Sequence, residues 1–397
     1  MTAPVTLHRG DCLSVMADLP AESFDAVVTD PPYHLTSIVR RFGANGAAPA
    51  VHGTDGLFAR SSRGFMGKEW DGGDIAFRVE TWAAVLRLLK PGGHLVAFNH
   101  SRTWHHMAVA IEAAGFEARD CLMWLYGTGF PKSHDVAKGI DKALGLEREI
   151  VGFDAAKAKR QTGKAGTAAF GDFAGNSGEI TAAASPEAAQ WEGWGTALKP
   201  GFEPIFLARK PLAETSIARQ HLATGTGGLN IDAARIPGAK PATVRGANTA
   251  GAVKFSGLGP QGRVEDDGKG RWPANVLHDG SREVLDRFPV DAEGSVARFF
   301  YSAKADAADR DGSDHPTVKP QALMRWLVRL VTARGGLILD PFGGSGSTAW
   351  AAAREGRRCH LIEREPDYQA HIADKIARLG DPAAPAAPAG SAQQSLF

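Results

Sequence analysis

The stretch FDAVVTDPPY, residues 24–33, decides how the chain is organised. Its first six residues are mostly apolar or β-branched, which predicts a buried strand, and Pro31 stops that strand directly after Asp30. Because prolines have no N–H, the residues after the strand offer carbonyl oxygens and a carboxylate, followed by the ring of Tyr33. Such a segment suits a flat ring that carries an exocyclic amino group. An ordinary Asp-Pro turn beside a core tyrosine explains these four residues alone equally well.

Strand and helix patterns alternate on both sides of this stretch. Near the N-terminus we expect strands at 5–10, 94–99 and 120–127, helices at 11–20, 76–89 and 104–114, and a turn at 90–93. Near the C-terminus we expect helices at 320–335 and 345–356, strands at 337–341 and 358–365, and a last helix ending at Leu379. This alternation predicts an α/β fold with a doubly wound, mostly parallel sheet, built from both ends of the chain.

The middle of the chain loses this alternation. Residues 155–190 are rich in Ala, Gly and Thr without an apolar stripe, which predicts a flexible insertion. The segment EPIFLARKP, residues 203–211, predicts a strand that pairs with 120–127. Between 235 and 272 seven basic residues face three acidic ones, a local excess of +4. On charge alone, a solvated loop is the more economical interpretation of this basic segment.

Composition excludes several classes of protein. The 397 residues contain 45 Lys and Arg against 44 Asp and Glu, so the formal charge of +1 excludes a uniformly basic surface for nucleic acid. Cys12, Cys121 and Cys359 are too scattered for a disulfide scaffold or a zinc cluster, and no metal site is expected. The sequence has no apolar run that could cross a membrane and no signal peptide, so we expect a cytoplasmic protein.

A second motif, DPFGGSG at 340–346, lies between a predicted strand and a predicted helix. Its glycines allow a tight turn and a close approach of a ligand to the backbone at a helix N-terminus. Glu363 follows 23 positions after Asp340, an offset at which an acid commonly binds nucleotide ribose hydroxyls. The motif lacks the Gly-Lys-Ser/Thr of a Walker loop and the full GxGxxG of a dinucleotide site. It therefore favours a nucleoside cofactor without a diphosphate.

Together, the two motifs resemble those of amino-group DNA methyltransferases that use S-adenosylmethionine, in the circularly permuted order of the beta group. In that group the catalytic DPPY precedes the cofactor loop FxGxG, here Phe342, Gly344 and Gly346. Other segments are also similar to the family, namely GDCLSVMADLP (10–20), FMGKEWDG (65–72), LKPGGHLVAF (89–98), WLYGTGFPKS (124–133) and HPTVKP (315–320). The resemblance implies a Rossmann-like methyltransferase sheet, circularly permuted, with an inserted target-recognition region.

The same resemblance implies how the chain is divided. Residues 1–135 would form the catalytic half of the methyltransferase domain, and 298–380 the cofactor-binding half. Between them we expect a flexible insertion at 136–195, a strand at 196–212 that returns to the catalytic sheet, and a target-recognition region at 213–297. Residues 381–397 form a tail rich in Pro and Ala.

Residue roles follow from the resemblance. The catalytic residues are expected to be Asp30, Pro31, Pro32 and Tyr33, where Asp30 and the Pro31 carbonyl accept the two N–H bonds of the target amine and Tyr33 stacks on the base. For the cofactor, Asp340 is expected to contact the methionine amino group and Glu363 the ribose. Asp11 and Cys12 are expected at the adenine ring, and Thr317 and Lys319 at the methionine carboxylate. The remaining expected contacts are the loop residues Pro341, Phe342, Gly344 and Gly346. For Asp11, a helix N-cap is an equally good interpretation. Expected DNA contacts are Arg235, Lys240, Arg245, Lys254, Arg263 and Lys269.

The resemblance implies a site-specific enzyme that methylates the N6 of a flipped-out adenine in double-stranded DNA. Family members with Asp first in the tetrapeptide mostly modify adenine, and those with Ser first tend to modify cytosine at N4, which is the alternative. Cytosine C5 chemistry fits poorly, because no cysteine follows a proline. RNA or protein-glutamine methyltransferases usually carry the cofactor loop before the tetrapeptide, whereas here it follows. A catalytically inactive DNA-binding or clamp-associated protein would be expected to lose residues that this chain retains.

A weaker resemblance lies at the C-terminus. Gln393, Leu396 and Phe397 fit the QxxLF-type peptide with which bacterial replication and repair proteins bind the sliding clamp. A frayed tail is the alternative interpretation. The family resemblance also implies a bacterial or phage origin and makes a homodimer an open alternative to a monomer.

Overall fold

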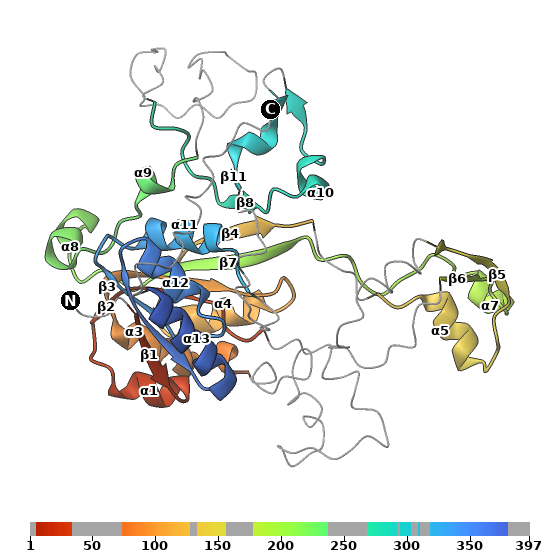
Figure 1. Cartoon of the computed structure of the whole chain (residues 1–397), viewed down its shortest axis with the longest axis horizontal. Coiled ribbons are helices and arrows are strands. Elements are labelled where there is room, and N and C mark those ends of the chain that lie inside the picture. The colour runs from red at the N-terminus through yellow and green to blue at the C-terminus, as the bar shows by residue number, and fades with distance from the viewer. Residues whose placement is uncertain are drawn as a thin grey trace. The chain divides into compact units, whose positions relative to one another are not determined.

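The computed structural model describes residues 5–33, 74–127, 133–155, 178–236, 268–291, 294–302, 309 and 318–379. The chain divides into two compact units. The larger unit contains residues 1–36, 71–127 and 202–397, and the smaller unit contains 37–70 and 128–201. Figure 1 shows the elements of both units.

A nine-stranded sheet forms the centre of the larger unit, in the order β1-β13-β12-β2-β3-β7-β4-β8-β11. The strands are β1 (Val5–Arg9), β2 (Phe24–Thr29), β3 (Leu89–Phe98), β4 (Glu117–Leu125), β7 (Phe202–Arg209), β8 (Val276–His278), β11 (Tyr301–Ser302), β12 (Leu337–Asp340) and β13 (Arg358–Glu363). Every pairing within this sheet is parallel except those of β7 with β3 and β4. The predicted α/β fold with a mostly parallel sheet is confirmed.

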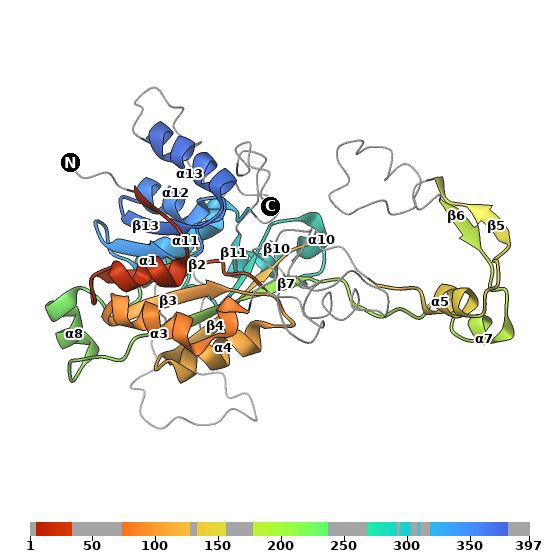
Figure 2. The same ribbon diagram turned by 90° about the horizontal axis from the view of Figure 1, so that it is seen from below.

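Helices cover both faces of this sheet, as Figure 2 shows. On one face lie η4 (Ile75–Phe77), α1 (Cys12–Asp18), α3 (Val79–Leu88) and α4 (Trp104–Ala113). On the other lie α11 (Gln321–Val331), α12 (Ser347–Arg354) and α13 (Pro366–Leu379). Successive residues of β2 point alternately into the two cores: Val27 belongs to the first, and Ala26 and Val28 to the second. The sheet is therefore doubly wound.

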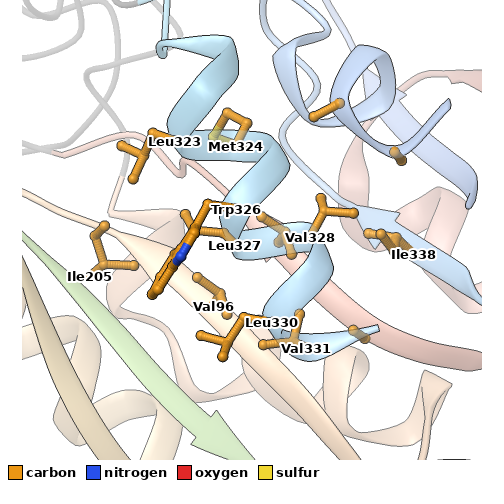
Figure 3. Close-up of a cluster of buried hydrophobic side chains, with 14 of the residues drawn as sticks. Val96, Ile205, Leu323, Met324, Trp326, Leu327, Val328, Leu330, Val331 and Ile338 are labelled. Carbon is orange, nitrogen blue, oxygen red and sulfur yellow. The ribbon is translucent and has the colours of Figure 1, made fainter. Parts of the chain in front are cut away.

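Helix α11 provides much of the second core. Leu323, Leu327 and Leu330 lie on its apolar face and pack over the sheet near Val96 and Ile205, as Figure 3 shows. Trp326 of the same helix is buried, and its indole N–H donates to the carbonyl of Ala234 at 3.0 Å. The remaining short elements of the larger unit are α8 (Ile217–Thr224), α9 (Ile231–Ala234), α10 (Arg282–Leu285), η5 (Val296–Phe299), β9 (Val290–Asp291) and β10 (Gly294–Ser295).

The main difference from the expected elements is at residues 90–93. The sequence predicted a turn here, but β3 begins at Leu89 and runs through the segment. Leu89 pairs with Phe24 of β2, the N–H of Gly92 donates to the carbonyl of Lys210 at 3.1 Å, and the Gly93 carbonyl accepts from the N–H of Lys210 at 2.9 Å. The pairing with β2 shifts register between Leu89 and His94, and Gly92 has a φ of 78°, so the Pro-Gly-Gly segment is an irregular part of β3 that hydrogen bonds to Lys210 hold in the sheet.

The smaller unit corrects part of the expectation for residues 136–195. The sequence predicted a flexible insertion, but the described residues form α5 (Val136–Ala143), α7 (Pro186–Ala189) and a hairpin of β5 (Ile150–Phe153) with β6 (Glu179–Thr181). Asp141 is buried and accepts from Ser185 Oγ at 2.7 Å and from Arg148 Nη1 at 2.9 Å. A few polar contacts between distant residues order this unit, which explains why apolar periodicity did not reveal it.

The expected target-recognition region, 213–297, contributes to the larger unit where it is described. Strand β8 of this region pairs in parallel with β4, and β11, which follows the region, extends the sheet by pairing with β8. Within the described ranges, none of the helices has the length and apolar character needed to cross a membrane.

Replacing Leu327 with Ala tests the core that α11 builds. The side chain is fully buried, so Leu327→Ala should lower the free energy of unfolding by about 2–5 kcal/mol. Leu222→Ala on α8 is the matched control, because that leucine is 88% exposed and its loss should change stability by less than about 0.5 kcal/mol. Urea unfolding followed by circular dichroism measures both, and equal effects would contradict this assignment of the core.

Candidate active site

One edge of the sheet collects polar side chains from strands that are distant in sequence. In parallel strands the carboxyl ends lie at the same edge, so Asp30 after β2, Tyr126 after β4 and Asp340 at the end of β12 meet there. Strand β7 runs in the opposite direction, so its beginning, with Glu203, reaches the same edge. Both the DPPY motif and the glycine-rich motif therefore lie at this edge.

Asp30 lies in a network of short polar contacts. Its carboxylate accepts a hydrogen bond from the Tyr33 hydroxyl at 2.7 Å and forms an ion pair with the Lys319 ammonium at 2.7 Å. Lys319 Nζ also donates to the Tyr33 hydroxyl at 3.0 Å. Pro31 is buried and Pro32 is partly buried between these residues in the sequence. The sequence analysis assigned Lys319 to the cofactor, and its contact with Asp30 was not foreseen.

Glu203 completes this network from β7. One of its oxygens lies 3.3 Å from Lys319 Nζ and also 3.3 Å from the Tyr33 hydroxyl. The Lys319 ammonium lies 5.0 Å from the ring centroid of Phe98 and 5.3 Å from that of Tyr33. Lys319 is thus a buried cation held by two carboxylates and two aromatic faces.

The network shifts the pKa values of its members. Burial would lower the pKa of Lys319, but the carboxylates of Asp30 and Glu203 outweigh burial and raise it, so the side chain stays charged. Burial raises the pKa of Glu203, which the neighbouring Lys319 only partly offsets. Burial, followed by the negative charges of Asp30 and Glu203, raises the pKa of Tyr33 well above its ordinary value. Tyr33 is therefore a neutral hydrogen-bond donor and not a base.

Asp340 joins the two motifs directly. Its Oδ1 accepts from the Thr29 hydroxyl at 2.7 Å, across 311 positions of sequence, and from the N–H of Phe342 at 3.1 Å. Burial raises the pKa of Asp340 to about 7, against the opposing effect of the hydrogen bonds from Thr29, Thr348 and Phe342, and the charge of Asp30 adds to the rise. Within the described residues, no ion pair to this carboxylate is formed.

The glycine-rich loop is shaped by close contacts with β13. Gly344 and Gly346 have φ values of 51° and 75°, a left-handed conformation that favours glycine. The Gly344 N–H donates to Glu363 Oε2 at 2.7 Å, and the other oxygen of Glu363 accepts from the N–H of Glu365 at 2.8 Å. Pro341 is buried, and Phe342 packs against the first core.

Asp11 acts as the N-cap of α1. Its Oδ1 accepts from the backbone N–H of Leu13 at 3.0 Å and of Ser14 at 3.1 Å. Cys12 is buried, and burial together with the charge of Asp11 raises the pKa of its thiol to about 12, so it is not a thiolate. The Gly10 N–H donates to the carbonyl of Glu363 at 3.0 Å, which keeps this turn beside the end of β13.

The other predicted site residues divide into two groups. Arg235 Nε donates a hydrogen bond to Asp232 Oδ1 at 2.8 Å, and its guanidinium lies over the ring of Trp272. The ammonium of Lys269 lies 3.7 Å from the other carboxylate oxygen of Asp232. The rest lie outside the described residues, namely Thr317, Lys240, Arg245, Lys254, Arg263, Gln393, Leu396 and Phe397. Among the residues that the structure describes, no group of His, Cys, Asp and Glu could hold a metal ion.

Sequence reasoning missed Glu203. The signal was present, because this acid begins a strand that was expected to pair with 120–127. Antiparallel pairing reverses which end of β7 reaches the carboxyl edge of its neighbours, and that reversal brings Glu203 to Lys319.

Comparison with known proteins agrees with this arrangement of motifs. The profile of a family of N6/N4 enzymes, described as DNA methylase, matches residues 24–374, most of the chain. The chain belongs to this DNA methylase family. The Type II methyltransferase M2.DpnII of Streptococcus pneumoniae is 46% identical over 54 residues, which cover 14% of this chain and 20% of that protein. The chain thus spans about a fifth of the length of that curated relative.

Solved structures with similar chains include two methyltransferase-related proteins. TTHA0409 of Thermus thermophilus, in complex with S-adenosyl-L-methionine, aligns with a TM-score of 0.39 and 19% identity over 94% of this chain and 95% of its own. The PvuII DNA methyltransferase, described as cytosine-N4-specific, aligns with a TM-score of 0.44 and 14% identity over 94% and 90% of the two chains.

Replacing Asp340 with Asn tests the buried carboxyl of this chain. The folded pKa of about 7 lies above the ordinary value of 3.8, so the folded chain holds a proton that the unfolded chain has lost between these pH values. In the wild type, the contribution of Asp340 to the free energy of unfolding is therefore present at low pH and is lost as pH rises towards and through 7. Between pH 5 and pH 8, Asp340→Asn should gain about 2–3 kcal/mol relative to wild type in urea unfolding. A difference that does not change with pH would contradict the raised pKa.

Proposed function

We propose that this chain is a site-specific DNA methyltransferase that transfers a methyl group from S-adenosyl-L-methionine to the exocyclic N6 of an adenine in double-stranded DNA. The observation that carries the proposal is the hydrogen bond from Thr29 to Asp340. It joins the strand that ends in the Asp30 acceptor motif to the strand that begins the glycine-rich loop. An acceptor for an amine and a candidate nucleoside site thereby share one edge of the sheet.

The acceptor side suits an aromatic amine. Such a nitrogen is a poor nucleophile because its lone pair is delocalised into the ring. A carboxylate at Asp30 and the carbonyl of Pro31 would accept its N–H bonds and localise the lone pair. No strong base is required, and the proton released after transfer leaves through Asp30 to water. Because a base within a duplex cannot reach such a site, the target nucleotide must be flipped out.

The residues at the end of β12 suit the cofactor. Asp340 is a buried carboxyl that receives hydrogen bonds but no ion pair within the described residues, so the amino group of methionine would supply its missing cation. Glu363 would hold the ribose hydroxyls, and Asp11 and Cys12 would border the adenine. When bound, the cofactor supplies a methyl group activated by a sulfonium. The chain contributes alignment and a preorganised electrostatic environment.

Transfer to N4 of cytosine is the second candidate, because its exocyclic amine suits the same acceptors. Asp as the first residue of the tetrapeptide favours adenine within the family. We further propose that DNA is bound through the basic segment 235–272, including Lys269, whose side chain is 59% exposed. A cytoplasmic enzyme of bacterial or phage origin, as a monomer or a homodimer, is consistent with this proposal.

Mapping modified bases by long-read sequencing tests the function. DNA from cells that express the wild-type chain should carry N6-methyladenine at one recurring sequence, and Asp30→Ala should remove it, with a rate loss of at least about 100-fold in vitro. Asp120→Ala is a control, since Asp120 is an exposed carboxylate on β4. N4-methylcytosine at a recurring site would replace the adenine assignment. Methylation confined to RNA or protein, or no methylation at all, would overturn the proposed function.

The C-terminal tail allows a separate prediction about a partner. Residues 381–397 lie outside the described residues, and we propose that Leu396 and Phe397 insert into the groove of a bacterial sliding clamp. Replacing both with Ala should weaken binding to purified clamp at least about tenfold in surface plasmon resonance, because two apolar anchors are lost. Gln394→Ala should bind as wild type does. Equal binding by the tail-deleted chain would refute this interaction.

A further inference from the structure

The Lys319 ammonium has all three of its donors occupied at the candidate active site. Its neighbours are Asp30 Oδ2 at 2.7 Å, the Tyr33 hydroxyl at 3.0 Å and Glu203 Oε2 at 3.3 Å. Together with Lys319, which lies just before α11, these residues come from three segments, the other two being the end of β2 and the start of β7. Glu203 is the only one of these four residues that the sequence analysis did not assign to the site, and its side chain is only 18% exposed.

The charges of this cluster do not cancel. One ammonium faces two carboxylates, so the cluster carries a net charge of −1 when all three groups are ionised. If Lys319 were paired with Asp30 alone, the net charge would be zero, and the ammonium would make the Asp30 carboxylate a weaker hydrogen-bond acceptor. Sharing the ammonium with a second carboxylate leaves more negative charge on Asp30. Positive charge develops on an amine nitrogen as it attacks a sulfonium methyl, so this excess stabilises the transition state.

We propose that Glu203 is a positioning residue for methyl transfer: it holds Lys319 and Tyr33 against Asp30 and keeps the acceptor site negatively charged. This inference rests on the proposed function and assigns a further residue to the same site. Glu203 acts through its neighbours, without touching the target base. Glu203 takes no part in the bond changes: the nitrogen–methyl bond forms as the sulfur–methyl bond breaks, and the surplus proton leaves through Asp30.

The antiparallel direction of β7 gives Glu203 a natural control, an ion pair at the opposite end of the same strand. At the opposite end of β7, Arg209 forms an ion pair with Glu117 of β4 at 2.6 Å. Glu117→Gln removes an acid that also bridges to a basic side chain, but at the edge of the sheet away from the candidate site. It should leave the rate of methyl transfer unchanged, because the two ends of the strand lie at opposite edges of the sheet.

The experiment measures single-turnover methyl transfer on a duplex that contains the sequence mapped for the wild-type chain. Glu203→Gln should lower the rate constant at least about tenfold, while the KM for S-adenosylmethionine and the Kd for the duplex stay within about threefold. Glu203→Asp should recover part of the loss, because it restores the carboxylate on a shorter side chain. Circular dichroism establishes that each variant is folded.

A double-mutant cycle distinguishes this role from an effect of lost packing around Glu203. If Glu203 acts through the ammonium, then Glu203→Gln should cost far less in a Lys319→Met background than in the wild type. The acid limb of the rate–pH profile should also change in Glu203→Gln, where Asp30, Tyr33, Lys319 and Tyr126 are the titratable groups that face Glu203. Additive losses and an unchanged profile would overturn the proposal.

The outcomes also separate this inference from the proposed function. A wild-type rate in Glu203→Gln, matching that of Glu117→Gln, would overturn the role of Glu203 while methyl transfer by the wild-type chain stands. Absence of methyl transfer by the wild-type chain to any DNA would instead overturn the proposed function, and the role of Glu203 with it.

Discussion

The parallel pairing of β2 with β12 is the constraint on which the rest of the site depends. Ile338 and Leu339 lie opposite Ala26 and Val27, so the two strands end at the same level. The hydrogen bond from Thr29 to Asp340 closes that pairing at its carboxyl end. Backbone pairing brings together two motifs from opposite ends of the sequence, and the buried side chains of α11 hold the strands in place.

The fold was largely predictable because most strands of the sheet, and the helices that cover it, carry their own local signals, although the short strands β8 and β11 do not. Residues 24–29 and 337–340 are short, mostly apolar strands, and an Asp-Pro pair marks the end of each. The stripe over 321–331 is that of a helix packed on a sheet. Local pattern could not reveal that 90–93 belongs to β3, since Pro-Gly-Gly has the composition of a turn. Its place in the sheet depends on the pairing of Leu89 and His94 with β2 and on hydrogen bonds to Lys210, which are distant in sequence.

The candidate site was predictable in its motifs but not in its contacts. Asp30 and Asp340 could be identified because proline and glycine mark them as strand ends. The contact of Lys319 with Asp30 could not be found in this way, because it depends on how the segment before α11 crosses the sheet edge. Glu203 required knowing that β7 runs antiparallel, and the order of the smaller unit depends on single polar contacts such as Asp141 with Ser185.

The two aspartates at this edge differ in whether a cation is paired with them. Asp30 already faces an ammonium and receives a hydroxyl, so its surroundings keep an acceptor oriented. Asp340 is buried with hydrogen-bond donors but without a paired cation among the described residues, and its pKa rises to about 7 as a result. A cationic ligand would offset the cost of burying an ionised Asp340, whereas a neutral amine suits Asp30. Because Thr29 connects the two strand ends, the proposed cation site at Asp340 and the proposed amine acceptor at Asp30 would be separate but adjacent, which is the arrangement that transfer between a charged donor and a neutral nitrogen requires.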